Sequence, residues 1–428
     1  MKLQIVAPVA IASVVLLAVV LYATGGDTTN TLTDIPQDDS VAIPQDDSVA
    51  IPQHIADANN SFAVDFYKKI IQADANTNQF FSPTSMYIAF SALYEGAEGN
   101  TAFQMEDVFG FEPDSQERHM LLGNTISSLN RDDPYATLKM ANALWPSKHY
   151  TLYDSYITTL QDTYQAHVEN LDFTSDDSVD TINQWASDNT NEKITKVYKK
   201  STASGSVVAV LTNAIYFKGD WLTAFPKEDT VENDFWTGTD NVRAEFMTLW
   251  PSAFDYAHVD NVQVLQMPYK GERLSMLLIL PSDKDGMGDL EDSLSYDLIR
   301  EWQDGLQNMD VNVKIPKFGM STKYDLKSIL VDLGMPYVFS DSDSNLPNIA
   351  VSPPDLNRIF FVSKATQAAF VNVNEEGTEA AAVTTIEVMF DDVPEIPYFV
   401  ADHPFIFIIQ DNESGTILFM GKVVDPTK

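Results

Sequence analysis

The chain has 428 residues, and 44% of them are hydrophobic, which is enough for a large core. Because 62 acids stand against 26 bases, the formal net charge is −36, and such a surface repels nucleic acid, heparin-like polyanions and anionic lipid. No cysteine is present, which excludes disulfides, thiol catalysis and thiolate metal sites. The acidic surface suits a salty medium, where screening relieves self-repulsion. A stability that stays flat from low to high NaCl would remove that hypothesis.

Residues 1–26 form a candidate targeting segment. After the single base Lys2, the run from Ile5 to Ala23 carries no charge. It is nearly long enough to cross a bilayer and longer than the apolar part of a usual signal peptide, while small residues at Ala23 and Gly25 permit cleavage. We expect either a retained membrane anchor or a cleaved export signal. In both cases the folded body is extracellular, either secreted or anchored to the outer face of the cell membrane.

Residues 27–53 read as a linker between this segment and the body. The octapeptide IPQDDSVA occurs at residues 35–42 and again at 43–50. A short acidic repeat that contains proline cannot bury a core, so we expect it to be extended and disordered. Residues 54–428 show no further linker, and we expect them to form one domain.

The body begins with helical patterns and continues with strands. Ser82-Pro83 is typical of a helix start, because serine caps and proline fits the first turn. Later, residues 207–217 and 274–280 are almost continuously apolar and read as strands buried on both faces. Residues 405–409 and 416–419 flank DNESG and predict a hairpin. Early helices followed by strands indicate an α+β body.

Residues 375–389, EEGTEAAAVTTIEVM, combine two conflicting signals. Every second residue is small or apolar, as in a strand with one buried face: Thr378, Ala380, Ala382, Thr384, Ile386 and Val388. An alanine run is nevertheless a poor strand former, and Gly377 favours a hinge. An edge strand or an alanine-rich helix start are the simpler alternatives. A segment that suits both a loop and a strand suggests a conformational switch.

Several segments between residue 54 and the C-terminus match one family pattern in the same order. They are residues 80–105, 182–194, 211–221, 266–281 with 314–318, 370–384 and 399–426. Together they resemble the serpins, the serine-protease-inhibitor family. The resemblance implies a large mixed five-stranded sheet A, two further sheets, about nine helices and an exposed reactive-centre loop.

In that family the loop is bait for a protease, and the resemblance implies the same here. The protease cuts the loop and forms an acyl-enzyme, and the cleaved loop then inserts into sheet A and traps the enzyme as a suicide complex. The hinge residues implied are Glu375, Glu376, Gly377, Thr378, Glu379, Ala380, Ala381 and Ala382. We expect Thr378 to enter the sheet first and face the core, and we expect Glu376 and Glu379 to stay in water.

The resemblance also assigns a gate to sheet A. Ser82, Ser85 and Asn213 match the family's shutter, where the strands must part, and Trp221 matches the breach, where the loop enters. The shutter usually contains a histidine at the position of Gln367. Glutamine donates and accepts hydrogen bonds but does not titrate. We therefore expect a closed shutter of altered strength without pH sensing at this residue.

The scissile bond stays open among neighbouring residues. The family's spacing from the hinge predicts cleavage between Asp391 and Asp392, whereas counting back from His403 shifts the bond about two residues later, next to Pro394. Phe390 suits the apolar pocket of a chymotrypsin-like or subtilisin-like enzyme. Phe390 and Asp391 are equally good candidates for the bait residue, and Met389 is a weaker candidate.

Other functions find little support in the sequence. None of the six histidines belongs to an HExxH zinc motif, and no GxSxG elbow is present. We expect no enzymatic activity, no cofactor and no metal site. The partner implied is a target serine protease in a covalent acyl complex, with the membrane as a second partner if the N-terminal segment is retained. A monomer that binds neither nucleic acid nor heparin is expected. The alternative is a non-inhibitory serpin fold that serves as carrier, chaperone or structural protein.

Overall fold

A computed structural model describes residues 51–428 apart from 131–132, 200–205, 352, 354–357 and 379–395. Contacts between residues divide the chain after Asp47, and Ser48–Lys428 form one compact unit. The predictions for residues 1–26, and for the linker up to residue 50, lie outside the described residues and stay predictions. Among the helices that the structure describes, none combines the length and apolar character that a bilayer crossing requires.

Nine α-helices occur in the described residues, in agreement with the expected number. Serine at position 82 caps the second of them, since its hydroxyl accepts a hydrogen bond from the backbone N–H of Ser85 and proline follows at the first helical position. The helices are α1 (Gln53–Ala73), α2 (Pro83–Tyr94), α3 (Gly99–Phe109), α4 (Ser115–Leu129), α5 (Asp154–Asp162), α6 (Asp177–Asn189), α7 (Met287–Ser293), α8 (Tyr296–Asp304) and α9 (Leu326–Asp332).

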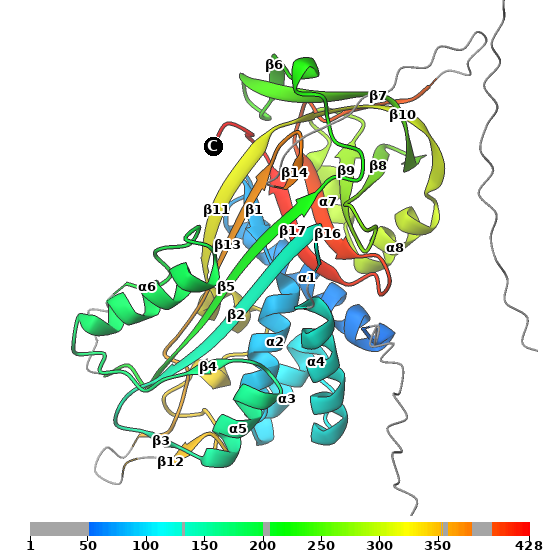
Figure 1. The fold of residues 1–428 in the computed structure, drawn as a ribbon. Helices are drawn as coiled ribbons and strands as arrows, with labels where there is room; N and C mark the ends of the chain where they lie inside the picture. The colour runs from blue at the N-terminus through cyan, green and yellow to red at the C-terminus, as the bar shows by residue number, and fades with distance from the viewer. Residues whose placement is uncertain (1–50, 131–132, 200–205, 352, 354–357, 379–395) are drawn as a thin grey trace, which may run out of the picture. The chain divides into compact units, whose positions relative to one another are not determined.

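The central sheet has the strand order β11-β13-β5-β2-β4, and the short β14 pairs with β5 (Figure 1). It is mixed, because β13 runs parallel to β5 and β2 runs parallel to β4, whereas β11 pairs antiparallel with β13 and β2 pairs antiparallel with β5. This is the predicted five-stranded sheet with one short extra strand. The strands are β2 (Ala136–Pro146), β4 (His167–Val168), β5 (Ala209–Asp220), β11 (Phe318–Asp325), β13 (Lys364–Val373) and β14 (Gly377–Thr378).

The two further sheets are continuous with each other, because the 19-residue strand β7 takes part in both. The strand order is β1-β17-β16-β9-β8-β7-β10-β15, with β6 also paired to β7. A separate ribbon joins β3 (Thr151–Leu152) to β12 (Ala350–Val351). The strands are β1 (Gln79–Phe81), β6 (Val231–Trp236), β7 (Asn241–Val259), β8 (Val262–Pro268), β9 (Leu274–Pro281), β10 (Gln307–Pro316), β15 (Tyr398–Val400), β16 (Phe405–Asp411) and β17 (Ile417–Val423).

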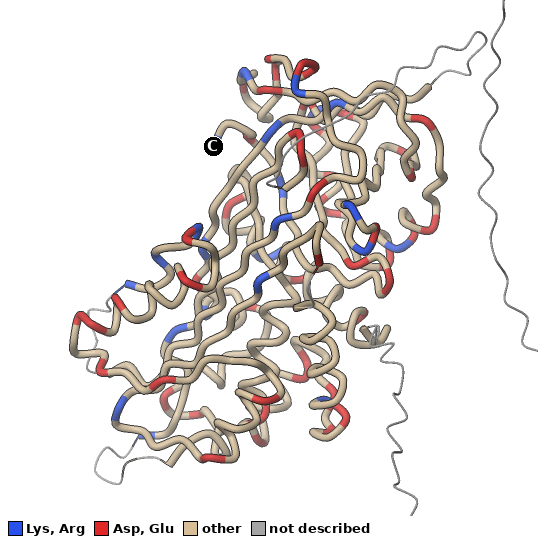
Figure 2. Tube along the Cα trace, viewed as in Figure 1, with Lys and Arg blue, Asp and Glu red and all other residues tan. Residues whose placement is uncertain are grey.

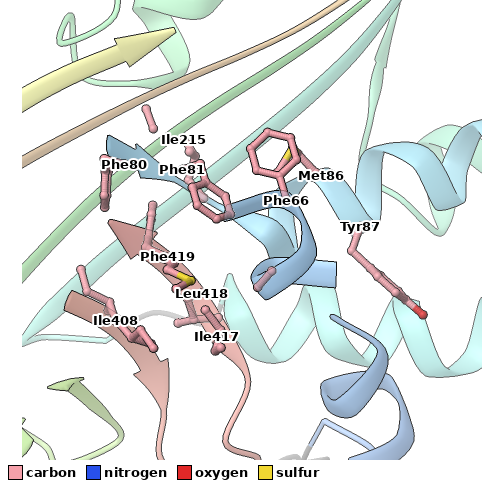
Figure 3. Packing of buried hydrophobic residues seen from close by; sticks show 14 of the residues in the cluster. Phe66, Phe80, Phe81, Met86, Tyr87, Ile215, Ile408, Ile417, Leu418 and Phe419 are labelled. Atoms are coloured by element: carbon pink, nitrogen blue, oxygen red, sulfur yellow. The ribbon is translucent and has the colours of Figure 1, made fainter. Parts of the chain in front are cut away.

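The main core lies where α1 and α2 meet β1, β16 and β17 (Figure 3). Phe80 stacks on Phe419 with ring centroids 5.1 Å apart, and Phe66 packs on Phe81 at 4.8 Å. A second cluster fixes α6 against β2 and β5, with Trp145 and Ile182 at its centre. The predicted buried strands and the C-terminal hairpin are confirmed, and the architecture is α+β.

Candidate functional site

The strands β13 and β5 are paired over only part of their length. Their parallel ladder runs from Lys364 opposite Val210 to Phe370 opposite Tyr216. Beyond that point the chain turns back through a tight hairpin at residues 374–377, and β14 pairs antiparallel with the end of β5. In the central sheet, β13 and β5 are therefore hydrogen-bonded to each other along the ladder. At the end where the hairpin lies, the short strand β14 pairs with β5 instead (Figure 1).

Gly377 lies where only glycine fits. Its φ angle is +150°, and a Cβ atom there would lie 2.1 Å from the backbone oxygen of Gly219. Real Cβ contacts are never that short, so any side chain would push β14 away from β5. The hinge glycine that the sequence suggested thus allows close approach of the two backbones.

Thr378 is fully buried, with 0% of its surface exposed. Its hydroxyl oxygen lies 3.0 Å from the hydroxyl of Tyr269, whose ring stacks on Trp221 at 4.6 Å between centroids. Burial raises the pKa of the Tyr269 hydroxyl, so it stays a neutral partner for Thr378. The side chain of Thr378 therefore faces the core, and its role at the entry of the loop stays a prediction.

Trp221 connects the hinge to the sheet. Its indole Nε1 donates to the backbone oxygen of Asn374 at 3.1 Å, and its backbone N–H donates to the oxygen of Glu376 at 3.0 Å. The ring is completely buried. Trp221 therefore binds both sides of the hairpin, and its role in a breach, which the resemblance implied, stays a prediction.

Glu375 is bound by two groups from outside the hinge. Its carboxylate lies 3.2 Å from the ammonium of Lys317 and accepts a 2.9 Å hydrogen bond from the Thr230 hydroxyl. Burial opposes ionisation, but hydrogen bonds from its own backbone, Thr230 and Lys317 outweigh it and lower the pKa of Glu375. Burial lowers the pKa of Lys317, but the hydrogen bonds and charges of Glu375 and Glu245 outweigh burial and raise this pKa overall.

Glu376 was expected to stay in water, and that expectation is wrong. Only 14% of its side chain is exposed, because it forms an ion pair with Lys227 of the 3₁₀ turn at Lys227–Asp229. The hydrogen bond and charge of Glu376 raise the pKa of Lys227. Two carboxylates of the hairpin are thus each paired with a lysine. We call the set Glu375, Glu376, Lys317 and Lys227 the hinge clasp.

Gln367 lies at the closed part of the sheet and uses both ends of its amide. Its Nε2 donates to the backbone oxygen of Ser82 at 2.9 Å and to Oδ1 of Asn213 at 2.7 Å, while its Oε1 accepts from the backbone N–H of Ser82 at 3.0 Å. Gln367 and Asn213 face each other across the β13–β5 ladder. The amide thus bridges two strands and the start of α2.

Asn213 extends this network to the next strand. Its Nδ2 lies 2.5 Å from Oδ1 of Asn142 on β2 and within hydrogen-bond distance of the Ser85 backbone and hydroxyl oxygens. The side chains of Ser82, Ser85, Asn213 and Gln367 are all buried. The predicted shutter residues are therefore brought together in one network, and Asn142 joins them.

The family profile described as Serpin (serine protease inhibitor) matches residues 57–426. The chain belongs to the serpin family. The human leukocyte elastase inhibitor is 34% identical over 382 residues, which cover 87% of this chain and 99% of that protein. Serpin48 of the insect Tenebrio molitor, described as highly specific, aligns with a TM-score of 0.78 at 29% identity, over 87% of this chain and 98% of the other.

Human thyroxine-binding globulin in complex with thyroxine also has this fold. It aligns with a TM-score of 0.79 at 26% identity and covers 89% of this serpin and 100% of its own chain. The same architecture thus occurs in an inhibitor of elastase and in a protein that holds a small molecule. Family membership supports protease inhibition in general terms.

Several residues of this serpin's hinge were not identified from sequence. Tyr269 and Lys317 lie in segments that matched the family, QMPYKG and KIPKF, yet nothing in either segment indicated a contact with the hinge. Lys227, Thr230 and Asn142 lie in segments to which no function was assigned. Their roles depend on contacts between residues far apart in the sequence, and no local pattern indicated them.

The remaining predicted site residues of the serpin lie outside the described residues. These are the hinge residues Glu379, Ala380, Ala381 and Ala382 and the candidates for the scissile bond, Met389, Phe390, Asp391 and Asp392. Their roles stay predictions.

Proposed function

We propose that this serpin is a suicide-substrate inhibitor of chymotrypsin-like or subtilisin-like serine endopeptidases. The observation that carries the proposal is the position of Thr378, which already occupies the entry between β13 and β5 with its side chain buried. Attack on the loop forms an acyl-enzyme. Insertion of the severed loop behind Thr378 then extends β14 along the sheet before the acyl bond is hydrolysed.

The ladder between β13 and β5 shows what insertion exchanges. One parallel ladder, from Lys364–Val210 to Phe370–Tyr216, would open. An inserted strand antiparallel to β5, as β14 already is, replaces it with two antiparallel ladders. Antiparallel pairing is slightly more stable per residue than parallel pairing, and the number of backbone hydrogen bonds rises. The exchange therefore favours the inserted form.

The small residues of the loop suit this movement. Ala380, Ala381 and Ala382 lose almost no side-chain entropy on burial. A large or charged residue would add a desolvation or packing cost of a few kcal/mol at the step that competes with deacylation. We place the scissile bond among residues 389–393, with Phe390 or Asp391 as bait.

The direct test is incubation of the full chain with chymotrypsin and with subtilisin, followed by denaturing electrophoresis. An SDS-stable complex of inhibitor plus protease is the expected product, and mass spectrometry of the released C-terminal peptide then identifies the scissile bond. If both enzymes yield only a shortened chain, inhibition of these two classes is rejected in favour of the carrier, chaperone or structural alternative. The thyroxine complex of the related globulin makes a carrier the specific rival.

We also propose where the inhibitor acts and what it does not bind. The uncharged run from Ile5 to Ala23 supports a body outside the cytoplasm, either secreted or anchored to the outer face of the cell membrane. On α4, Arg118 is buried and paired with Glu95 at 2.7 Å, so this cation is not presented to a polyanion. Together with the net charge of −36, this supports a monomer that binds neither heparin nor nucleic acid.

A further inference from the structure

Two aromatic side chains stand exposed on the sheet that receives the C-terminal end of the loop. Trp250 on β7 is 59% exposed, and Tyr398 on β15 is 62% exposed. All six tryptophans of the chain lie in described residues, and Trp250 is the one with an exposed ring. Exposed large aromatic residues are costly in water and are enriched at protein interfaces.

The strand register places these two residues on one face. Tyr398 lies opposite Asn312 on β10, and on the other side of β10 the register shift between Val311 and Val313 leaves Trp250 and Pro251 together opposite Asn312. The chain neighbours of these residues point to the other face of the sheet, where all three are buried: Leu249 next to Trp250, Val313 next to Asn312 and Phe399 next to Tyr398. Because neighbouring strands lie about 4.8 Å apart, the positions of Trp250 and Tyr398 are on the order of 10 Å apart. We call this pair the aromatic patch.

The distance to the bait limits what can lie over this patch. Tyr398 follows Asp391 by seven positions in the sequence, so their Cα atoms are at most about 25 Å apart even in a fully extended chain. A globular protease of about 250 residues is about 45 Å across. An enzyme that holds the bait in its active site therefore has its own surface within reach of Tyr398.

The charges around the aromatic patch restrict the partner further. On β10, Asp310 and Lys314 lie two residues to either side of Asn312 and carry opposite charges. The side chains of Glu232, Asp234 and Glu245, on β6 and β7, are each more than half exposed, and Arg243 and Lys317 balance these three only in part. Acidic residues also predominate over the rest of the described chain (Figure 2). A second copy of this serpin would bring the same negative charge, which opposes self-association. A protease with basic residues around an apolar contact is complementary.

We propose that the aromatic patch is a second contact site for the target protease, separate from the bait and from the hinge. This inference rests on the proposed function and specifies how the partner is recognised. Contact at Trp250 and Tyr398 stabilises the encounter complex before the loop is attacked. It raises the rate of attack and leaves unchanged the fraction of attacks that end in trapping, because that fraction depends on loop insertion.

The test compares the full chain with the double variant Trp250→Ala/Tyr398→Ala. Chymotrypsin and subtilisin are the probes, and the total rate of loop attack is measured as complex plus cleaved chain. We expect the double variant to be attacked about tenfold more slowly, in the range typical of interface hot spots, with an unchanged trapped fraction. The conservative variant Trp250→Phe/Tyr398→Phe should recover most of the rate.

Phe103→Ala is the matched control, because Phe103 is 64% exposed but lies on α3, at the end of the serpin away from β7 and β10 (Figure 1). Its rate should equal that of the wild type. Attack on the double variant at the wild-type rate by both enzymes would overturn the proposal. So would a wild-type dimer, seen by sedimentation, that the double variant abolishes. Cutting without trapping in the wild type rejects the inhibitor function instead, and the attack rates still test the patch.

Discussion

At the scale of single residues, the proposed mechanism requires Thr378 to enter the sheet before the acyl bond is hydrolysed. Its small side chain is fully buried against Tyr269. Thr378→Arg would place an unpaired charge in that site at a cost of several kcal/mol. We expect the variant to be cut at the normal rate and released without a complex, and thus to become a substrate. Thr378→Ser keeps the hydroxyl and serves as the control that should still form the complex on denaturing gels.

The folded chain should nevertheless tolerate Thr378→Arg. The substitution lies at the end of the two-residue strand β14, so its removal from the sheet leaves the β13–β5 ladder intact. An unchanged far-ultraviolet circular dichroism spectrum is expected. An arginine variant that traps protease as well as the wild type would contradict the role given to Thr378.

A second prediction at this scale concerns the contribution of the Glu375 carboxylate to stability. Its pKa is lower in the folded chain than its ordinary value of 4.5, so the unfolded state takes up the proton more readily as the pH falls. The stabilisation by the carboxylate is therefore complete above about pH 4.5 and is lost below it. Glu375→Gln should lower the free energy of unfolding by about 2 kcal/mol at pH 7.

The pH dependence separates this effect from a simple packing defect. Urea unfolding of wild type and Glu375→Gln should differ most between pH 6 and 8, and the difference should shrink as the pH falls toward 3. The raised pKa of Lys317 adds a contribution that is lost only at strongly alkaline pH. A difference that stays constant from pH 8 to pH 3 would show that the charge of Glu375 is not involved.

At the scale of elements, the shutter is a network that joins β13, β5, β2 and α2. Gln367→Ala leaves the Ser82 backbone groups and Asn213 Oδ1 without the partner they have now. Unsatisfied buried groups and the resulting cavity should cost about 3 kcal/mol. The loosened strands should also insert the uncut loop or link to other chains. Size-exclusion chromatography after mild heating would detect such species.

Gln367→His is the informative control, because neutral histidine keeps one donor and one acceptor. It should recover most of the stability at pH 8. As the pH falls through about 6.5, protonation removes the acceptor that the Ser82 N–H needs. Stability of this variant should then fall, whereas the wild type has no titrating group at this position. Equal pH profiles between pH 5 and 8 would contradict the network.

The elements were largely predictable from local patterns, since the cap at Ser82 and the apolar runs of β5 and β9 depend on neighbours in sequence. The face of the strand on which Thr378 lies was predictable too, because successive residues of a strand point to opposite faces of the sheet. The hinge clasp was not. From the sequence we expected Glu376 to be exposed to solvent, whereas in the fold it pairs with Lys227. No local pattern encodes a contact between residues so far apart in the sequence. Nor did any pattern show that β7 is long enough to join two sheets.

At the scale of the whole molecule, the account requires a native form that is not the most stable one. In the proposed mechanism, the ladder between β13 and β5 keeps the sheet one strand short, and the free energy gained on insertion is released only after the loop is cut. Family resemblance predicted this architecture for residues 54–428. For the residues before it, the uncharged run from Ile5 to Ala23 and the repeated octapeptide predicted a targeting segment followed by a linker.

The melting temperature before and after a single cut in the loop tests the central claim most directly. Limited proteolysis between residues 389 and 393, checked by mass spectrometry, gives the nicked chain with both fragments held together. If the loop inserts, the melting temperature should rise by more than about 10 °C, which corresponds to about 5 kcal/mol at about 2 °C per kcal/mol. A nicked chain that melts at the same temperature as the intact one would contradict insertion.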